Sequence, residues 1–408
     1  MTGRVEHTAP ATLPRMQYAS IVDRVRGLGG DMWAVHTRAA ARRAAGEDII
    51  LLTLGEPDFP TPPGVIDAAI NAMNRGRTKY SSGRGEPNLR AAVAAKYAAR
   101  TGRPVGPEDV VFLPGTQTAL CLTMMTLAEA GDDVLVPEPY YATYRGVLAT
   151  SGARIVPVPL SADDGFHLRP ETLEAASTPN SRALLLNSPH NPTGATLTRA
   201  EIEAISEVCV ELDLWVVSDE VYDGLVYSGE FASPFDLDHM VERTVVVSSL
   251  SKSHAMTGWR CGWAVGTPEF INNLLPVSES MLFGSQPFLQ DAAAAALLED
   301  FGEVHEMRAS YARRAWLVVD HLADVEGVVC TMPDAGIFVM LDVRASGVDG
   351  LTFAERLLDE EGVAVMPGES FGPSAAGHVR LSVVADGPTL EEACARIRRF
   401  AKVLTAAR

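Results

Sequence analysis

The chain of 408 residues has few cysteines, no membrane-length apolar run and a shortage of basic residues. Its five cysteines are widely spaced and form no CxxC pair, which is typical of reduced thiols rather than of a disulfide framework or a zinc site. No apolar run approaches the length of a membrane span, and the N-terminus lacks the basic and apolar segments of a secretion signal. The sequence therefore predicts a soluble, cytoplasmic protein without a bound metal.

The charge balance argues against a nucleic-acid partner. Lysine and arginine total 34 against 52 aspartate and glutamate residues, which gives a formal net charge of -18. Phosphate recognition needs a basic face, so DNA and RNA binding are disfavoured. An acidic chain attracts cationic substrates over long range, although solubility alone explains the same excess. With 47% hydrophobic residues, the chain is long enough for a large core and two domains.

Strand and helix patterns alternate from about residue 87 onward. Helical patterns at 88–102, 116–131, 140–152 and 199–213 separate short runs that are rich in β-branched and other apolar residues. The seven predicted strands are 109–115, 132–139, 153–159, 181–189, 214–220, 244–250 and 260–266. Such alternation implies crossover connections, so we expect an α/β fold with a mostly parallel seven-stranded sheet covered by helices.

The two ends of the chain differ from its middle in their pattern of predicted helices and strands. Residues 1–30 show little periodicity and are expected to form a mobile arm. In the C-terminal third, a long helical stretch from roughly 287 to 323 is followed by two strands around a turn, a helix, a strand and a final helix. These patterns predict a smaller α+β domain, formed by 31–55 and 300–408, beside a large domain at 56–299.

One lysine follows a predicted strand in the stretch "VVVSSLSKSHAMTGWRCGW", residues 245–263. The valines predict a buried strand and the serines a turn, so Lys252 lies on a loop at a strand end. Ligands bind at that edge of open α/β sheets. A nucleophilic lysine must lose its proton near neutral pH, which a neighbouring cation such as Arg260 and burial by the nearby tryptophans favour. A surface lysine on a serine-rich loop is the alternative.

The loop "PGTQTAL" joins a predicted strand to a predicted helix. Backbone N–H groups of Gly115, Thr116 and Gln117 at a helix N-terminus form an anion site by geometry and dipole. Ordinary helix capping explains such a loop equally well.

Two further strand ends carry polar side chains. "NSPHNPTGA" places Asn187 and Asn191 in a stiff turn, which either orients the Asn191 amide or is simply structural. "SDEVYDG" ends an apolar strand with Asp219, where a carboxylate is costly unless it is paired. A protonated ring nitrogen accounts for this acid, and so does capping of a following helix.

Together these loops supply an amine that forms imines, donors for an anion, an acid and an oriented amide. Pyridoxal 5'-phosphate (PLP) needs that set. The segments "LGEPDFPTP", "KYSSGRGEPNLR", "NSPHNPTGA", "SDEVY" and "SLSKSHAMTGWRCGW" match, in order and spacing, the fold-type I, class I PLP-dependent aminotransferases. The chain resembles that family from about Asp31 onward, and the resemblance implies the PLP-dependent transferase fold of type I.

The resemblance implies a role for each candidate residue. Lys252 is expected to form the Schiff base and to shuttle a proton, while Asp219 pairs with the pyridine nitrogen. Tyr222 and Asn191 are expected at the ring oxygen. The other expected cofactor-binding residues are Tyr141, stacked on the ring, and Gly115, Thr116, Gln117, Ser249 and Arg260 at the phosphate.

Substrate and partner contacts are implied in the same way. Arg380, in "HVRLSVV", matches the arginine that grips the substrate α-carboxylate, for which a planar guanidinium is well suited. Gly55 and Asn191 are the other expected substrate contacts. Members of the family are homodimers, so Tyr80 of "KYSSG" is expected to reach the phosphate in the partner's site.

The substrate is expected to be arginine or a related guanidino amino acid, with a 2-oxo acid such as pyruvate as the second substrate of a ping-pong reaction. "NSPHNPTGA", "SLSKSHAMTGWR", "MLFGS" and "GESFGPSAAGHVRL" are similar to bacterial arginine–pyruvate transaminases. Gln117 stands where some aspartate-preferring members have lysine, which argues against a dicarboxylate. Glu56, Asp58 and Glu279 are candidates for binding a guanidinium, and for each a solvated or structural carboxylate is the alternative.

Other readings use the same residues. A PLP-dependent oxidase, lyase or decarboxylase would need the same cofactor site, because fold and cofactor do not fix the reaction. An aminotransferase specific for aspartate or aromatic amino acids is a further alternative. A ligand-sensing transcription regulator is disfavoured, since the stretch before Asp31 is short for a DNA-binding domain and the chain is acidic.

Overall fold

The structure is a computed structural model that describes residues 17–28 and 31–406. Its largest sheet has seven strands in the order β2-β8-β7-β6-β5-β3-β4. The strand β8 runs antiparallel to both of its neighbours, and the other pairs are parallel. The predicted seven-stranded, mostly parallel sheet is confirmed. Its strands are β2 (Val110–Leu113), β3 (Asp133–Glu138), β4 (Arg154–Pro159), β5 (Ser181–Asn187), β6 (Trp215–Asp219), β7 (Thr244–Ser249) and β8 (Gly262–Val265).

Helices cover both faces of this sheet, which explains why its strands are nearly continuous apolar runs. In β7, Val245 and Val247 join the core on one face, whereas Val246 joins the core on the other. The first face packs against α5 (Thr116–Leu127), α6 (Tyr144–Ser151) and α9 (Pro268–Leu282). The second face packs against α3 (Pro63–Asn74), α4 (Pro87–Thr101), α7 (Pro170–Ala176), α8 (Arg199–Glu211) and α10 (Pro287–Leu298).

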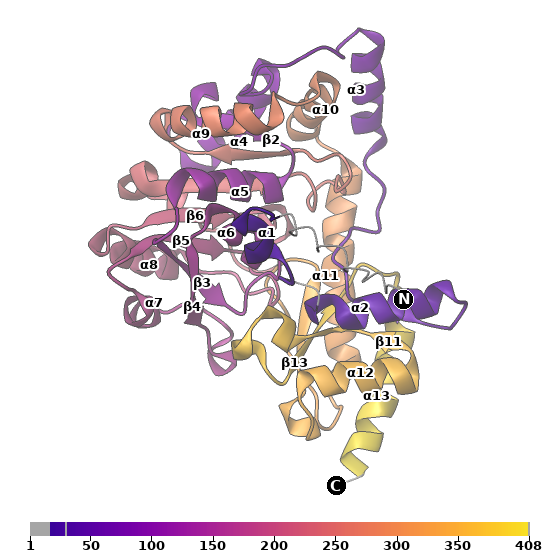
Figure 1. Cartoon of the computed structure of the whole chain (residues 1–408). Coiled ribbons are helices and arrows are strands. Elements are labelled where there is room, and N and C mark those ends of the chain that lie inside the picture. The colour runs from indigo at the N-terminus through magenta and orange to yellow at the C-terminus, as the bar shows by residue number, and fades with distance from the viewer. Residues whose placement is uncertain (1–16, 29–30, 407–408) are drawn as a thin grey trace, which may run out of the picture.

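A second apolar core lies in the lower part of Figure 1. It is built on a four-stranded sheet of order β12-β13-β10-β9 and a parallel pair, β1 and β11. The strands are β1 (Ile50–Leu51), β9 (Val329–Cys330), β10 (Phe338–Asp342), β11 (Val363–Ala364), β12 (Met366–Pro367) and β13 (His378–Ser382). The helices are α2 (Ala34–Ala44), α11 (Gly302–Leu322), α12 (Gly350–Glu361) and α13 (Gly387–Ala406).

The predicted helical stretch over 287–323 is helical but is not one continuous helix. The stretch forms α10 and α11, with a break around Phe301, whose backbone is extended. The Phe301 ring packs so closely on Gly64 that a Cβ there would lie 2.7 Å from it, so tertiary packing fixes the break. Helix α9 was not predicted, although Thr267 caps it and Pro268 begins it, which is a recognisable start signal.

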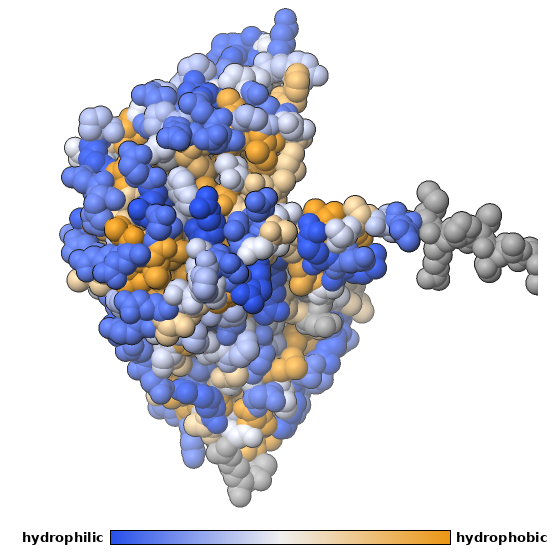
Figure 2. Space-filling model, turned by 60° about the vertical axis from the view of Figure 1, so that its left-hand side comes forward, coloured by the Kyte–Doolittle hydropathy of each residue, from blue (hydrophilic) through white to orange (hydrophobic). Residues whose placement is uncertain are grey.

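Part of the predicted arm, residues 1–16 and 29–30, lies outside the described residues. Residues 20–25 form α1 (Ser20–Val25), which lies against α6 (Figure 1), and the Arg24 side chain donates to the Ala149 carbonyl at 3.0 Å. On the face shown in Figure 2, hydrophilic residues separate the apolar ones into groups. Within residues 17–28 and 31–406, no helix is long and apolar enough to cross a membrane.

Candidate active site

A pocket of about 350 Å³ lies at the carboxyl ends of the central parallel strands. Asn187, Asp219 and Ser249 end β5, β6 and β7, and all three line the pocket. The first turn of α5, the segment around Gly55 and the strand β13 close it from other sides. Chain segments far apart in the sequence therefore meet at the sheet edge where α/β proteins bind ligands.

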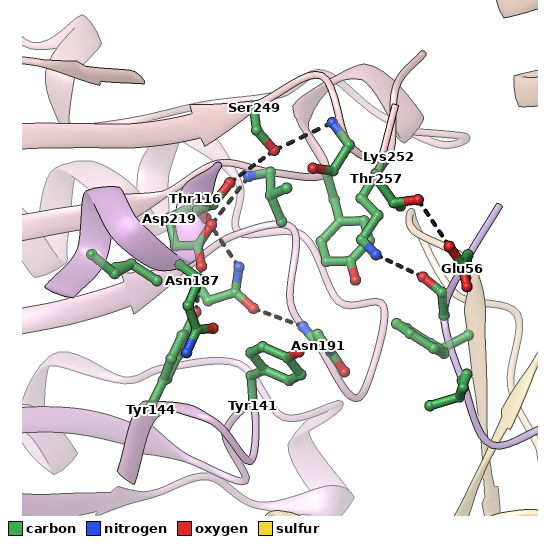
Figure 3. A pocket seen from close by; sticks show the side chains of 18 of the residues that line it. Glu56, Thr116, Tyr141, Tyr144, Asn187, Asn191, Asp219, Ser249, Lys252 and Thr257 are labelled. Atoms are coloured by element: carbon green, nitrogen blue, oxygen red, sulfur yellow. Dashed lines mark hydrogen bonds between the residues drawn. The ribbon is translucent and has the colours of Figure 1, made fainter. Parts of the chain in front are cut away.

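Lys252 enters this pocket from the loop after β7 (Figure 3). Its Nζ donates a hydrogen bond to the Gly55 carbonyl at 2.6 Å. Burial lowers the pKa of Lys252 to about 8; the nearby Glu56 carboxylate opposes this shift, and the cations Arg380 and Arg260 add to it. A lysine with such a pKa is partly neutral near pH 7 and thus nucleophilic.

Asp219 is a buried acid, 4% exposed, at the opposite end of the pocket from Glu56 (Figure 3). Its Oδ2 accepts a hydrogen bond from the Tyr144 hydroxyl at 2.6 Å, and its Oδ1 accepts one from the Val221 N–H at 3.2 Å. Burial raises the pKa of Asp219 to about 6, and the hydrogen bond from Tyr144 opposes the rise. A buried carboxylate of this kind is stabilised by a cation placed against it.

The N-terminus of α5 presents hydrogen-bond donors to the pocket. Thr116 donates to the Ser249 hydroxyl at 2.9 Å, and Arg260 lies beside them, donating to the Pro114 carbonyl at 3.2 Å. Gly115 caps the helix at φ +83°, and a Cβ on it would lie 2.3 Å from Arg260 Nη2, so only glycine fits. Two hydroxyls, a guanidinium and a helix N-terminus form an anion site.

Arg380, on β13, is 2% exposed and lies over the Phe338 ring at 3.9 Å. Its Nη1 donates to Asn191 Oδ1 at 2.8 Å and its Nη2 to the Thr53 carbonyl at 2.7 Å, while Nε is buried without a partner. Burial lowers the pKa of Arg380 to about 10. Within the described chain no carboxylate pairs with this guanidinium, which makes it a strong site for a ligand carboxylate.

Two tyrosines complete the pocket wall. Tyr141 lies edge-to-face with Tyr144, with ring centroids 5.8 Å apart. Tyr222 is 4% exposed, and burial raises the pKa of its hydroxyl well above the ordinary value. The Tyr222 hydroxyl is therefore a neutral donor at physiological pH.

Most of the residues expected from the sequence meet in this one pocket. They are Gly55, Thr116, Gln117, Tyr141, Asn191, Asp219, Tyr222, Ser249, Lys252, Arg260 and Arg380. Gly115 contributes as the cap of α5 beside Arg260. Tyr80 lies outside the pocket, 86% exposed and edge-to-face with Phe283 at 5.1 Å.

The three acidic candidates for guanidinium binding separate clearly. Glu56 lines the pocket. Asp58 instead forms an ion pair with Arg314 at 2.8 Å, and Glu279 lies against Gly83, outside the pocket lining.

Several lining residues were missed from the sequence. Tyr144 follows Tyr141 by three positions, a helical spacing that places both on one side and was a usable signal. Leu54 and Thr257 lie within quoted segments but were given no role, whereas Trp33 and Phe338 come from outside those segments, so no local pattern pointed to them.

The site combines an amine of lowered pKa, an anion site, a buried acid and an unpaired guanidinium. A cofactor with an aldehyde, a phosphate and a basic ring nitrogen fits the first three, and a substrate carboxylate fits the fourth. The pocket therefore has the composition of a PLP-dependent enzyme acting on amino acids.

Comparisons with known proteins agree with this class. Residues 47–397 match the family of class I and II aminotransferases. The chain is 47% identical over 382 residues to the arginine–pyruvate transaminase of Pseudomonas aeruginosa, covering 94% of this chain and 97% of that protein. It is 37% identical over 374 residues to the aspartate/prephenate aminotransferase of Thermus thermophilus, covering 91% and 95%.

A solved structure is similar as well. The aspartate aminotransferase of Thermus thermophilus with maleate superposes with a TM-score of 0.89 at 35% identity, covering 95% of this chain and 100% of that one. The chain belongs to the class I and II aminotransferases, with the fold-type I architecture expected from its sequence. It is an aminotransferase, and PLP is its cofactor.

Proposed function

We propose that the protein transfers the amino group of L-arginine, or of a related guanidino amino acid, to a 2-oxo acid such as pyruvate. The observation that carries this proposal is the 47% identity, over nearly the whole of both chains, to an arginine–pyruvate transaminase. The pocket supports it in two ways. The buried guanidinium of Arg380 has no carboxylate partner in the described chain and can bind an α-carboxylate, and position 117 holds glutamine, so it offers no cation for a side-chain carboxylate.

We assign the cofactor contacts as follows. Asp219 would hold the ring nitrogen in its protonated form, and Tyr222 with Asn191 would bind the ring oxygen. Tyr141 would stack on the ring. The phosphate would be bound by Gly115, Thr116, Gln117, Ser249 and Arg260. When bound, PLP supplies an aldehyde that condenses with amines and a ring that accepts the electron pair released at the substrate Cα.

The remaining residues act on the substrate. Arg380 binds the α-carboxylate through its two Nη groups, and Asn191 and Gly55 complete that contact. This contact would orient the Cα–H bond toward Lys252, whose neutral Nζ would take the proton from the substrate Cα and hold it for return. The low pKa of Lys252 makes its amine a competent base near neutral pH.

The assembly proposed for the active enzyme is a homodimer in the cytoplasm. Tyr80, which is exposed and lies outside its own pocket, would reach the partner's phosphate site. Each subunit would consist of an arm at 1–30, a small domain at 31–55 and 300–408, and a large domain at 56–299. The separate apolar cores support this division, and the free thiols of all five cysteines suit a reducing compartment.

The test is a product assay with the PLP-loaded enzyme, arginine and pyruvate. We expect alanine and 5-guanidino-2-oxopentanoate in equal amounts, with parallel lines in double-reciprocal plots. Ammonia or hydrogen peroxide formed without an acceptor would indicate a lyase or an oxidase instead. Turnover of aspartate or an aromatic amino acid, with none of arginine, would refute the substrate and leave aminotransfer intact.

A further inference from the structure

One acidic side chain in the pocket, Glu56, forms no ion pair within the described residues, although its charge acts on the nearby Lys252. Glu56 lies at the opposite end from Asp219, with Lys252 between them (Figure 3). Its Oε1 accepts a hydrogen bond from the Thr257 hydroxyl at 2.9 Å. In the part of the chain that the structure describes, no ion pair includes this carboxylate. Its charge is thus free to act on a ligand.

The other charged groups of the pocket have occupants under the proposed function. Arg260 is taken by the phosphate, Asp219 by the ring nitrogen and Arg380 by the substrate α-carboxylate. Lys252 would be engaged by the cofactor aldehyde, so it would not remain as a free ammonium partner for Glu56. Because Gln117 is neutral, the negative charge of Glu56 is the one left for the substrate side chain.

The backbone at residues 53–56 places the Glu56 carboxylate within reach of a long substrate side chain whose α-carboxylate is bound by Arg380. The Thr53 carbonyl accepts from Arg380, and the Gly55 carbonyl accepts from Lys252. The segment therefore passes Arg380, which would bind the substrate's carboxylate, and Lys252, which would take its Cα proton, and then reaches Glu56. Three residues span at most about 10 Å, a length that a long side chain with a terminal cation bridges.

Apolar side chains also line the pocket that contains Glu56. Trp33 and Leu54 line the same pocket, and Leu54 lies two residues from Glu56. Such side chains suit the methylene groups of a long substrate side chain. An indole ring also attracts cations to its face.

We propose that the Glu56 carboxylate binds the cationic group at the end of the substrate side chain. The inference rests on the proposed function and names the residue that selects the substrate. A guanidinium adds a positive charge to its two parallel N–H donors, so it binds a carboxylate more strongly than a neutral isostere of equal length. Because Glu56 is exposed, salt weakens the contact.

The test is a binding measurement on the PLP-loaded enzyme with two unreactive ligands that lack the α-amino group. These are 5-guanidinopentanoate, which is cationic at its end, and 5-ureidopentanoate, its neutral isostere. We expect the wild type to bind the guanidino ligand tighter by on the order of tenfold. Glu56→Gln should abolish this preference while leaving the affinity for the ureido ligand unchanged, and Glu56→Asp should retain part of it.

The matched control is Glu207→Gln, which removes the same charge from the exposed face of α8 and should behave as the wild type. The inference is overturned if the wild type shows no preference, if Glu56→Gln keeps it, or if that variant weakens both ligands equally. Activity separates the two proposals: failure to transaminate any guanidino amino acid refutes the proposed function. Transamination of arginine with an unchanged preference in Glu56→Gln refutes only the role of Glu56.

Discussion

The two acidic side chains at opposite ends of the pocket lie in contrasting surroundings (Figure 3). Asp219 is buried at the end of a central strand and accepts hydrogen bonds from a tyrosine and a backbone amide. Glu56 is exposed on an irregular segment and accepts one hydrogen bond from a neutral hydroxyl.

Under the proposed roles, the contrast separates Asp219, which would hold the cofactor in every reaction, from Glu56, which would meet different substrates. A buried carboxylate with fixed donors keeps one position and strongly favours a cation beside it. An exposed carboxylate exchanges partners with water at little cost. Changes at the Asp219 end should therefore damage every reaction, whereas changes at the Glu56 end should alter the choice of substrate.

The largest effect is expected for Lys252→Ala, which removes the amine that lies between Asp219 and Glu56. Loss of the base that moves the Cα proton should lower kcat by about 10⁴-fold or more with every amino donor. Turnover numbers and the absorption spectrum of the bound cofactor check this. Activity within tenfold of the wild type would contradict the role of Lys252.

Asp219→Asn removes the negative charge of the buried acid and leaves Glu56 unchanged. A neutral amide no longer favours a protonated ring nitrogen, so we expect kcat to fall by about 10²- to 10³-fold for arginine and for any uncharged donor alike. Steady-state rates with both donors are the measurement. A loss confined to arginine would mean that Asp219, not Glu56, senses the side chain.

The rate at which the enzyme takes up PLP should depend on the pKa of Lys252, which lies between Asp219 and Glu56. The neutral amine reacts with the aldehyde, and the pKa of Lys252 is lowered to about 8. The rate of PLP uptake by cofactor-free enzyme should rise about tenfold per pH unit below pH 8 and level off above it. A rate that still climbs above pH 9 would show that the lysine is not perturbed.

Tyr144→Phe is expected to have a smaller effect. The Tyr144 hydroxyl lowers the pKa of Asp219, so its removal raises that pKa further above about 6 and extends the pH range in which the carboxyl is neutral. We expect PLP binding at pH 6 to weaken by about 3- to 10-fold, with less change at pH 8, as followed by equilibrium titration. Equal weakening at both pH values would indicate a packing defect instead.

The central sheet and its strand-end loops could be predicted because their signals are local. Valine runs followed by serine, asparagine or aspartate mark where parallel strands end, and parallel strands bring those ends to one edge. The break at Phe301 could not be predicted, because it depends on contact with Gly64, distant in the sequence. Likewise, nothing local separates Glu56 from Asp58; the ion pair of Asp58 with Arg314 forms only in the folded chain.

The most direct test is the half-reaction of the PLP-loaded enzyme with arginine, without oxygen and without a 2-oxo acid. We expect one equivalent of 5-guanidino-2-oxopentanoate per active site, no free ammonia, and a change in cofactor absorption that pyruvate reverses while alanine forms. Continued release of ammonia, or an absorption change that pyruvate does not reverse, would contradict amino transfer from arginine to pyruvate.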